Sequence, residues 1–155
     1  MADSAAHIGA GAHLQKGDGN SPENFISILG IKSITGPGIK RDTIEVTDMD
    51  SGTFKEYIGG LVDGGVISFQ ANFLPRDATQ NQTAGGFMAE FDKTSCDSRG
   101  NWRITLPECA GDSEGYFEFA GIVTGQSVTI PLEALMEFTG DIQVSGRPKL
   151  IILAS

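Results

Sequence analysis

Residues 36–75 read GPGIKRDTIEVTDMDSGTFKEYIGGLVDGGVISFQANFLP, a long polar stretch followed by an alternating apolar run. Glycine and proline open it, carboxylates crowd its middle, and a Gly-Gly pair and the turn Asp63-Gly64-Gly65 close it. The alternation from Val66 to Phe73 predicts a half-buried strand. A polar loop of this length in a small domain is usually functional or disordered. We therefore expect the loop to contact another molecule.

The rest of the chain shows short alternating apolar runs separated by turn residues, which is typical of β-strands. The turn Gly17-Asp18-Gly19-Asn20 joins the first two of them. Turns at such short intervals predict a mainly β fold, a β-sandwich or barrel-like packing of two sheets. The expected strands lie at His13–Lys16, Phe25–Ile34, Ile44 with Val46, Ile67–Phe73, Trp102–Leu106, Phe117–Val123, Val128–Leu132, Ile142 with Val144, and Leu150–Leu153.

One segment has helical spacing. From Thr83 to Lys93, apolar residues recur every three or four positions, which predicts a flanking α-helix with one apolar face. The pair Gly85-Gly86 weakens this helix by about 1 kcal/mol per glycine relative to alanine, so it depends on packing. Residues Leu132–Phe138 fit either a helical turn or a strand end.

Composition limits the classes of function. The 155 residues suit a single domain, 1–155, and carry 11 basic and 20 acidic side chains, a formal charge of -9. Tight wrapping of a nucleic-acid backbone is therefore disfavoured. No apolar run approaches the roughly 18 residues of a membrane helix, and the N-terminus does not resemble a secretory signal. We expect no membrane partner, residence in a cytoplasm, and reduced thiols at Cys96 and Cys109.

The chain offers little for catalysis or metal binding. His7 and His13 lie in an N-terminal arm, residues 1–16, that we expect to be flexible and unable to hold a general base. Asp48 and Asp50 begin like a calcium loop, but Gly59 stands where a bidentate glutamate is needed. Pairs among Glu114, Glu118, Glu133 and Glu137 suit a glycosidase only if they face one another, and chance pairs are plentiful. We expect no enzyme activity, no cofactor and no metal site.

The remaining possibility from the residues alone is assembly. A β domain leaves edge strands with unpaired backbone groups, which a protein either shields or uses to join neighbours. An arm and a loop that become ordered on contact add specificity to such joining. Subunits that join head to tail can close a ring.

Several motifs resemble one family. They are the Gly17-Asp18-Gly19 turn followed by Pro22-Glu23-Asn24-Phe25, and then Gly36-Pro37-Gly38, Arg41–Thr47, Asp50-Ser51-Gly52, Glu56–Gly65 and, more weakly, Val144–Pro148. Together they are similar to the major tail tube proteins of long-tailed bacteriophages with non-contractile, siphovirus-type tails. The resemblance covers the whole chain and is most specific in residues 36–65.

The resemblance implies a tail tube fold, a β-sandwich with one flanking helix. It also implies six subunits in a ring, rings stacked into a tube, and double-stranded DNA passing through the tube during ejection. Other tail proteins at the tube ends, a place in the virion tail, and assembly in the host bacterial cytoplasm follow from it. Residues 1–16 resemble an arm that bridges subunits. Residues 36–52 resemble the loop that reaches the adjacent ring, with candidate contacts at Pro37, Arg41, Asp42, Glu45, Asp48, Asp50 and Ser51.

The net negative charge of the chain suits a tube through which DNA passes. Six subunits of -9 give about -54 per ring (6 × 9), and an acidic wall repels DNA and keeps it mobile. Candidate lumen carboxylates are Glu118, Glu133, Glu137 and Asp141, with ordinary solvated surface as the alternative for each. Arg41, Lys55 and Arg103 are candidates for pairing with neighbouring subunits. The alternative function is a β-sandwich carbohydrate- or receptor-binding module, with a glycoside hydrolase third.

Overall fold

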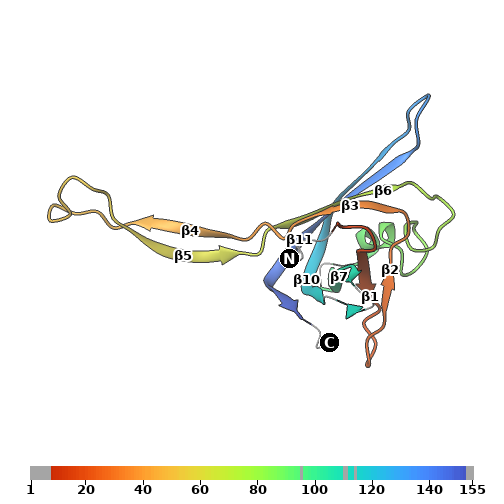
Figure 1. Ribbon diagram of the computed structural model, residues 1–155, viewed down its shortest axis with the longest axis horizontal. Coiled ribbons are helices and arrows are strands. Elements are labelled where there is room, and N and C mark those ends of the chain that lie inside the picture. The colour runs from red at the N-terminus through yellow and green to blue at the C-terminus, as the bar shows by residue number, and fades with distance from the viewer. Residues whose placement is uncertain (1–7, 95, 110–111, 114, 153–155) are drawn as a thin grey trace, which may run out of the picture.

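A computed structural model describes residues 8–94, 96–109, 112–113 and 115–152. It is built mainly of β-strands, as the alternating runs predict (Figure 1). Within the described residues there is one short helix, the 3-10 helix η1 (Met88–Asp92). The strands are β1 (His13–Gly17), β2 (Phe25–Ser27), β3 (Ile31–Thr35), β4 (Lys40–Glu45), β5 (Tyr57–Asp63), β6 (Val66–Asn72), β7 (Arg99–Thr105), β8 (Glu108–Cys109), β9 (Asp112–Ser113), β10 (Tyr116–Thr129) and β11 (Glu137–Ile151).

Seven strands form one antiparallel sheet in the order β2-β1-β7-β10-β11-β6-β3. Strands β2 and β3 lie at opposite edges, yet only residues 28–30 connect them. Such a connection spans at most roughly 14 Å, so the two edges lie close together. The main sheet is therefore one sheet curled around the core, and not the two stacked sheets of a sandwich.

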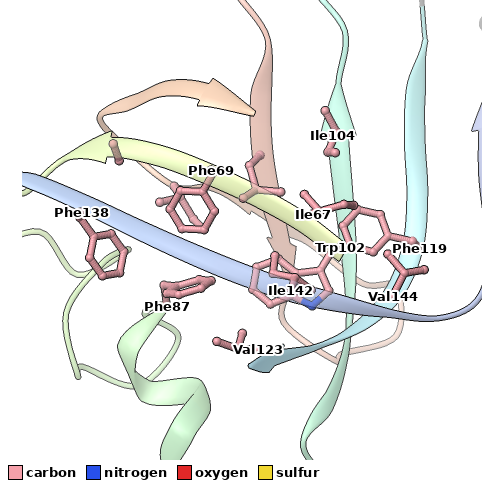
Figure 2. Close-up of a cluster of buried hydrophobic side chains, with 13 residues drawn as sticks. Ile67, Phe69, Phe87, Trp102, Ile104, Phe119, Val123, Phe138, Ile142 and Val144 are labelled. Carbon is pink, nitrogen blue, oxygen red and sulfur yellow. The ribbon is translucent and has the colours of Figure 1, made fainter. Parts of the chain in front are cut away.

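The core lies inside this curl (Figure 2). Trp102 is fully buried, and its indole nitrogen donates a hydrogen bond to the carbonyl oxygen of Gly121 at 3.3 Å. Phe87 packs edge-on against Phe69 and Phe138, with ring centroids 4.9 and 5.5 Å away. These aromatic rings come from β6, β7, β11 and the segment before η1, so the core joins elements far apart in sequence.

The two longest strands each combine runs that the sequence pattern separates. Strand β10 unites the run Phe117–Val123 with Val128, and β11 unites Ile142 and Val144 with Leu150. Register shifts at 118–120 and 123–125 change the phase of the alternation along β10. The expected strand Val128–Leu132 is wrong beyond Thr129, because Ile130 and Leu132 lie in the turn between β10 and β11.

The flanking α-helix expected over Thr83–Lys93 is wrong. Turns replace it, and only Met88–Asp92 is helical, in the 3-10 form. Gly85 has a φ of +95°, which ends any regular helix through the Gly-Gly pair. The segment is held by packing and side-chain hydrogen bonds instead. The buried Gln80 amide donates to the carbonyl oxygens of Leu29 (2.7 Å) and Asn72 (2.9 Å).

The last residues of the expected flexible arm, residues 1–16, belong to the sheet instead. Residues 13–16 belong to β1, which pairs with β2 and β7 in the main sheet. Leu14 is fully buried, and Lys16 forms a buried ion pair with Glu90 of η1. The predicted strand at His13–Lys16 is confirmed, whereas residues 1–7, including His7, lie outside the described residues.

Candidate assembly surface

The stretch expected to be an extended loop is a two-stranded ribbon. Strands β4 and β5 pair only with each other, in a register that matches Glu45 with Tyr57 and Lys40 with Asp63. The ribbon projects far from the curled sheet (Figure 1). It interrupts the chain between β3 and β6, which are themselves neighbours in the main sheet. The ribbon is thus an insertion between two paired strands.

Exposed apolar side chains cover this ribbon. All six residues of β4 are exposed, and an isolated two-stranded hairpin is at best marginally stable in water. Exposed patches of this kind mark interaction sites. Its exposed apolar residues are Ile39, Ile44, Val46, Met49, Phe54, Tyr57, Ile58, Leu61 and Val62.

Glycine builds the base of the ribbon. A Cβ at Gly65, which has a φ of +81°, would lie 2.3 Å from the carbonyl oxygen of Gly38. A Cβ at Gly36 would lie 2.7 Å from the carbonyl oxygen of Val66. The amide of Gln143, on β11, donates to the carbonyl oxygen of Gly65 at 3.0 Å. These close approaches fix the ribbon to the sheet, and only glycine permits them without displacement.

The tip of the ribbon is an ordered turn. The Asp48 carboxylate accepts hydrogen bonds from the Asp50 backbone N–H (2.9 Å) and from the Ser51 hydroxyl (3.2 Å). The Asp48 backbone N–H donates to the Ser51 Oγ at 3.0 Å. Asp48 and Ser51 therefore shape the turn, which leaves Met49, fully exposed, at its apex.

The structure places the seven assembly-loop candidates together on this ribbon and its base. Pro37 follows Gly36 at the base, Arg41, Asp42 and Glu45 lie on β4, and the other three lie in the tip. Sequence reasoning missed β5, the second half of the surface. Gly59 and Gly60 resemble a turn, but both lie within β5, where Cβ atoms would crowd Arg41 and Asp42.

The four lumen candidates all lie on β10, β11 or the turn between them. Buried Phe138 and Ile142 alternate along β11 with Glu137 and Asp141, so both carboxylates lie on the sheet face opposite the core. By the same alternation with Phe119, Glu118 lies on that face. Glu133 is separate, exposed in the turn.

Ion pairs offset part of this acidic charge. Glu137 pairs with Lys32 of β3 at 2.7 Å, and Glu118 lies 3.8 Å from Arg103 of β7. Asp141 accepts a 2.6 Å hydrogen bond from the Ser68 hydroxyl and, like Glu133, forms no ion pair with any described residue. The net charge of the face therefore rests more on Asp141 than on its ion-paired neighbours.

Arg103 serves its own subunit. Its guanidinium lies between two rings, 3.9 Å from the Phe25 centroid and 4.1 Å from the Tyr116 centroid. These contacts join β2 to β7 and β10. These contacts within the subunit compete with the expected pairing of Arg103 with a neighbouring subunit. Arg41 and Lys55, in contrast, form no ion pair in the described part of the chain.

The Asp18 carboxylate holds the turn Gly17-Asp18-Gly19-Asn20. The Asp18 carboxylate accepts backbone hydrogen bonds from Asn20 (2.9 Å) and Asn24 (3.1 Å), which lower the pKa of Asp18 below its usual 3.8. The GDGN turn is thus confirmed.

Among the described residues, no three His, Cys, Asp or Glu side chains gather as metal ligands. Cys96 is free and exposed, while Glu114 and the Cys109 side chain lie outside the described parts.

None of the helices in the described part of the chain has both the length and the apolar character needed to span a membrane.

No protein-family model and no curated protein matches the sequence. Solved structures match its fold. A chain from the tail of an empty gene transfer agent particle with C6 symmetry is 16% identical, with a TM-score of 0.68 over 94% of this chain and 99% of that one. A chain of the sheath–tube complex of an extracellular contractile injection system, PVC, is 12% identical (TM-score 0.70, covering 96% and 93%). A chain of the SPP1 tail tube is 12% identical (0.62, covering 94% and 80%). The chain therefore has a fold found in the tails of phage-like particles and in contractile injection systems.

Proposed function

We propose that this chain is the non-catalytic structural subunit of a phage tail tube, of the siphovirus type, located in the virion tail after assembly in a bacterial cytoplasm. Six copies form a ring, and rings stack into a hollow tube. The observation that carries the proposal is the projecting β4–β5 ribbon, whose apolar side chains are exposed in the described subunit. The sixfold symmetry of the gene transfer agent tail supports the ring.

In this proposal the ribbon reaches the adjacent ring. A subunit that binds a copy of itself by burying apolar area needs apolar side chains that are not already buried in its own core. The ribbon supplies such surface on a ladder of backbone hydrogen bonds, with a glycine-built base that holds its direction. Other tail proteins would bind the same surfaces where the stack begins and ends.

The wall of the bore is the sheet face opposite the core. Short polar side chains alternate with the core residues of β6 and β11, and Asp141 and Glu137 lie among them. Such a face gives DNA few cations to bind and, at Asp141, a charge that repels phosphate. Double-stranded DNA would pass without specific binding.

Electron microscopy of the concentrated, purified protein tests the assembly. We expect sixfold rings and tubes, and sedimentation should show a concentration-dependent shift from monomer to large species. A protein that stays monomeric at every concentration and binds glycans would instead support the carbohydrate- or receptor-binding alternative. Hydrolysis abolished by one carboxylate-to-amide change would support a glycoside hydrolase.

A further inference from the structure

A second apolar projection lies at the turn between β10 and β11. The turn, residues 130–136, extends beyond β6, which ends opposite Glu137, and it stands clear of the sheet (Figure 1). Leu132 is 98% exposed, and Ile130 and Leu135 are each 71% exposed. Glu133 is the only charged residue in the turn, and it forms no ion pair with any described residue. We name residues 130–136 the apolar turn.

A groove of about 1130 Å³ lies beside the other end of β11. Its apolar lining includes Ile39, Val62 and Leu150, which are each about half exposed. This space is larger than the 300–1,000 Å³ of a typical small-molecule pocket. A chain segment with several apolar side chains suits it better than a small ligand does.

The charge in the groove is unusual for this protein. Its lining contains Arg41, Arg147 and Lys149 and, among the described residues, no carboxylate. None of these three cations forms an ion pair in the described part of the chain. In a chain with a formal charge of -9, three unpaired cations beside one apolar groove indicate an acidic and apolar partner.

The apolar turn has this chemistry but cannot reach the groove of its own subunit. The turn precedes Glu137, where β11 begins, and the groove lies beside residues 146–151, where β11 ends. A strand of 15 residues spans up to about 45 Å. The two surfaces are therefore held apart by the element that connects them, and contact between them requires two molecules.

We propose that the apolar turn of one subunit docks in the groove of another copy, with Leu132 and Leu135 in the apolar lining and Glu133 beside Arg147 and Lys149. The inference rests on the proposed self-assembly and specifies one of its contacts. The contact is heterologous, because each copy offers a turn to one neighbour and a groove to another, so it can repeat around a ring. Apolar burial supplies most of the affinity, and the charges fix the orientation. This role moves Glu133 from the bore to an interface.

The competing occupant is the tip of the β4–β5 ribbon, which is also apolar and acidic. Its Asp48 carboxylate is already used by the Asp50 N–H and the Ser51 hydroxyl, but its Asp50 carboxylate, like that of Glu133, has no partner among the described residues, so charge does not separate the two occupants. Apolar surface does separate them, because four large apolar side chains are exposed within the seven residues of the apolar turn, Ile130, Leu132, Leu135 and Met136, against Val46, Met49 and Phe54 over the eleven residues 46–56 of the tip. We therefore assign the groove to the turn and make the ribbon tip an outcome of the test.

Charge reversal tests the pairing. Glu133→Arg and Arg147→Glu should each raise the protein concentration needed for tube formation by roughly tenfold, and the double variant should return it towards wild type. Asp92→Arg, an exposed change of equal charge on η1, is the matched control and should assemble normally. Normal assembly of both single variants, or a double variant no better than either, would contradict the pairing.

Disulfide trapping keeps the contact testable where one exposed charge pair has little effect. In a Cys96→Ser, Cys109→Ser background, Leu132→Cys combined with Ile39→Cys should give cross-linked chains on mild oxidation of assembled protein, and neither cysteine alone should do so. Met49→Cys with Ile39→Cys reports the competing occupant. Cross-linking through position 49 but not 132 overturns the inference and leaves the tube intact. If wild-type protein and Asp92→Arg both fail to assemble, the proposed function fails as well.

Discussion

Single residues in the core tie together elements that the chain order separates. Phe87 lies just before η1, yet its ring packs against β6, β7 and β11, with the Trp102 ring centroid 6.0 Å away. Gln80 has a similar role through polar contacts. Its buried amide accepts a hydrogen bond from the Leu74 backbone N–H and donates to the carbonyl oxygens of Leu29 and Asn72. The irregular segment from 73 to 94 is therefore held by a few fully buried side chains, and not by regular secondary structure.

Phe87→Ala should lower the free energy of unfolding by about 3–5 kcal/mol, because it removes a fully buried ring and leaves a cavity among aromatic neighbours. Phe91→Ala is the matched control, since Phe91 lies four residues later, in η1, and is 45% exposed. It should cost less than about 1 kcal/mol. Urea denaturation monitored by Trp102 fluorescence measures both, and similar losses for the two variants would contradict this account of the core.

Among the elements, the β4–β5 ribbon combines a rigid base with an unpartnered surface. The glycine contacts and the Gln143 hydrogen bond hold its base, while β4 and β5 pair with each other and with no other described strand. The ribbon is therefore separable from the fold, because β3 and β6 pair with each other without it.

Replacing residues 46–56 by Asn-Gly should shorten the ribbon without unfolding the subunit. Glu45 and Tyr57 already face each other across the ladder, and Asn-Gly forms the two-residue turn that such a pair requires. Circular dichroism and the urea midpoint should stay near wild type, while tubes should be lost. The double variant Met49→Ser, Phe54→Ser, which keeps the length and removes only apolar surface, should weaken assembly in the same direction. Loss of folding in the shortened chain would contradict the assignment of the ribbon to contact.

The elements also show what the sequence could predict and what it could not. Strand β6 was predictable because buried Ile67, Phe69 and Ala71 alternate with polar residues. The helix prediction failed because Gly85 leaves the helical region and Phe91 is exposed rather than buried. Strand β5 was missed because both its faces are exposed in the isolated subunit, so no burial pattern marks it. The groove depends on β4, β5, β10 and β11 meeting in space, which no local pattern contains.

Across the described part of the molecule, charge and apolar surface are unevenly distributed. Most of the exposed large apolar side chains lie on two projections, the ribbon and the apolar turn, while the outward face of β6 and β11 carries mainly polar and acidic groups. Three cations without an ion pair among the described residues, Arg41, Arg147 and Lys149, lie in the groove. Such segregation suits a subunit that binds copies of itself through some surfaces and leaves another bare.

Asp141→Lys should make the proposed tube, which is expected not to bind DNA, retain it. The change alters the charge by about +12 per ring of six (6 × 2) on the proposed wall of the bore, so phosphate contacts become favourable and salt-dependent. Labelled duplex DNA incubated with assembled tubes and then washed should be retained at low salt and released at high salt. Asp92→Lys, on η1, is the matched control. Equal retention by both variants would remove Asp141 from the wall.

The insertion of the ribbon between two paired strands has a consequence for how such subunits can diverge. Because β3 and β6 remain partners whatever lies between them, residues can be added to or removed from the ribbon in opposing pairs without disturbing the curled body. Each two-residue extension of both strands would lengthen it by about 7 Å. In the proposed tube, the length of the ribbon would therefore set how far each subunit reaches along the axis, while the curled body stays the same.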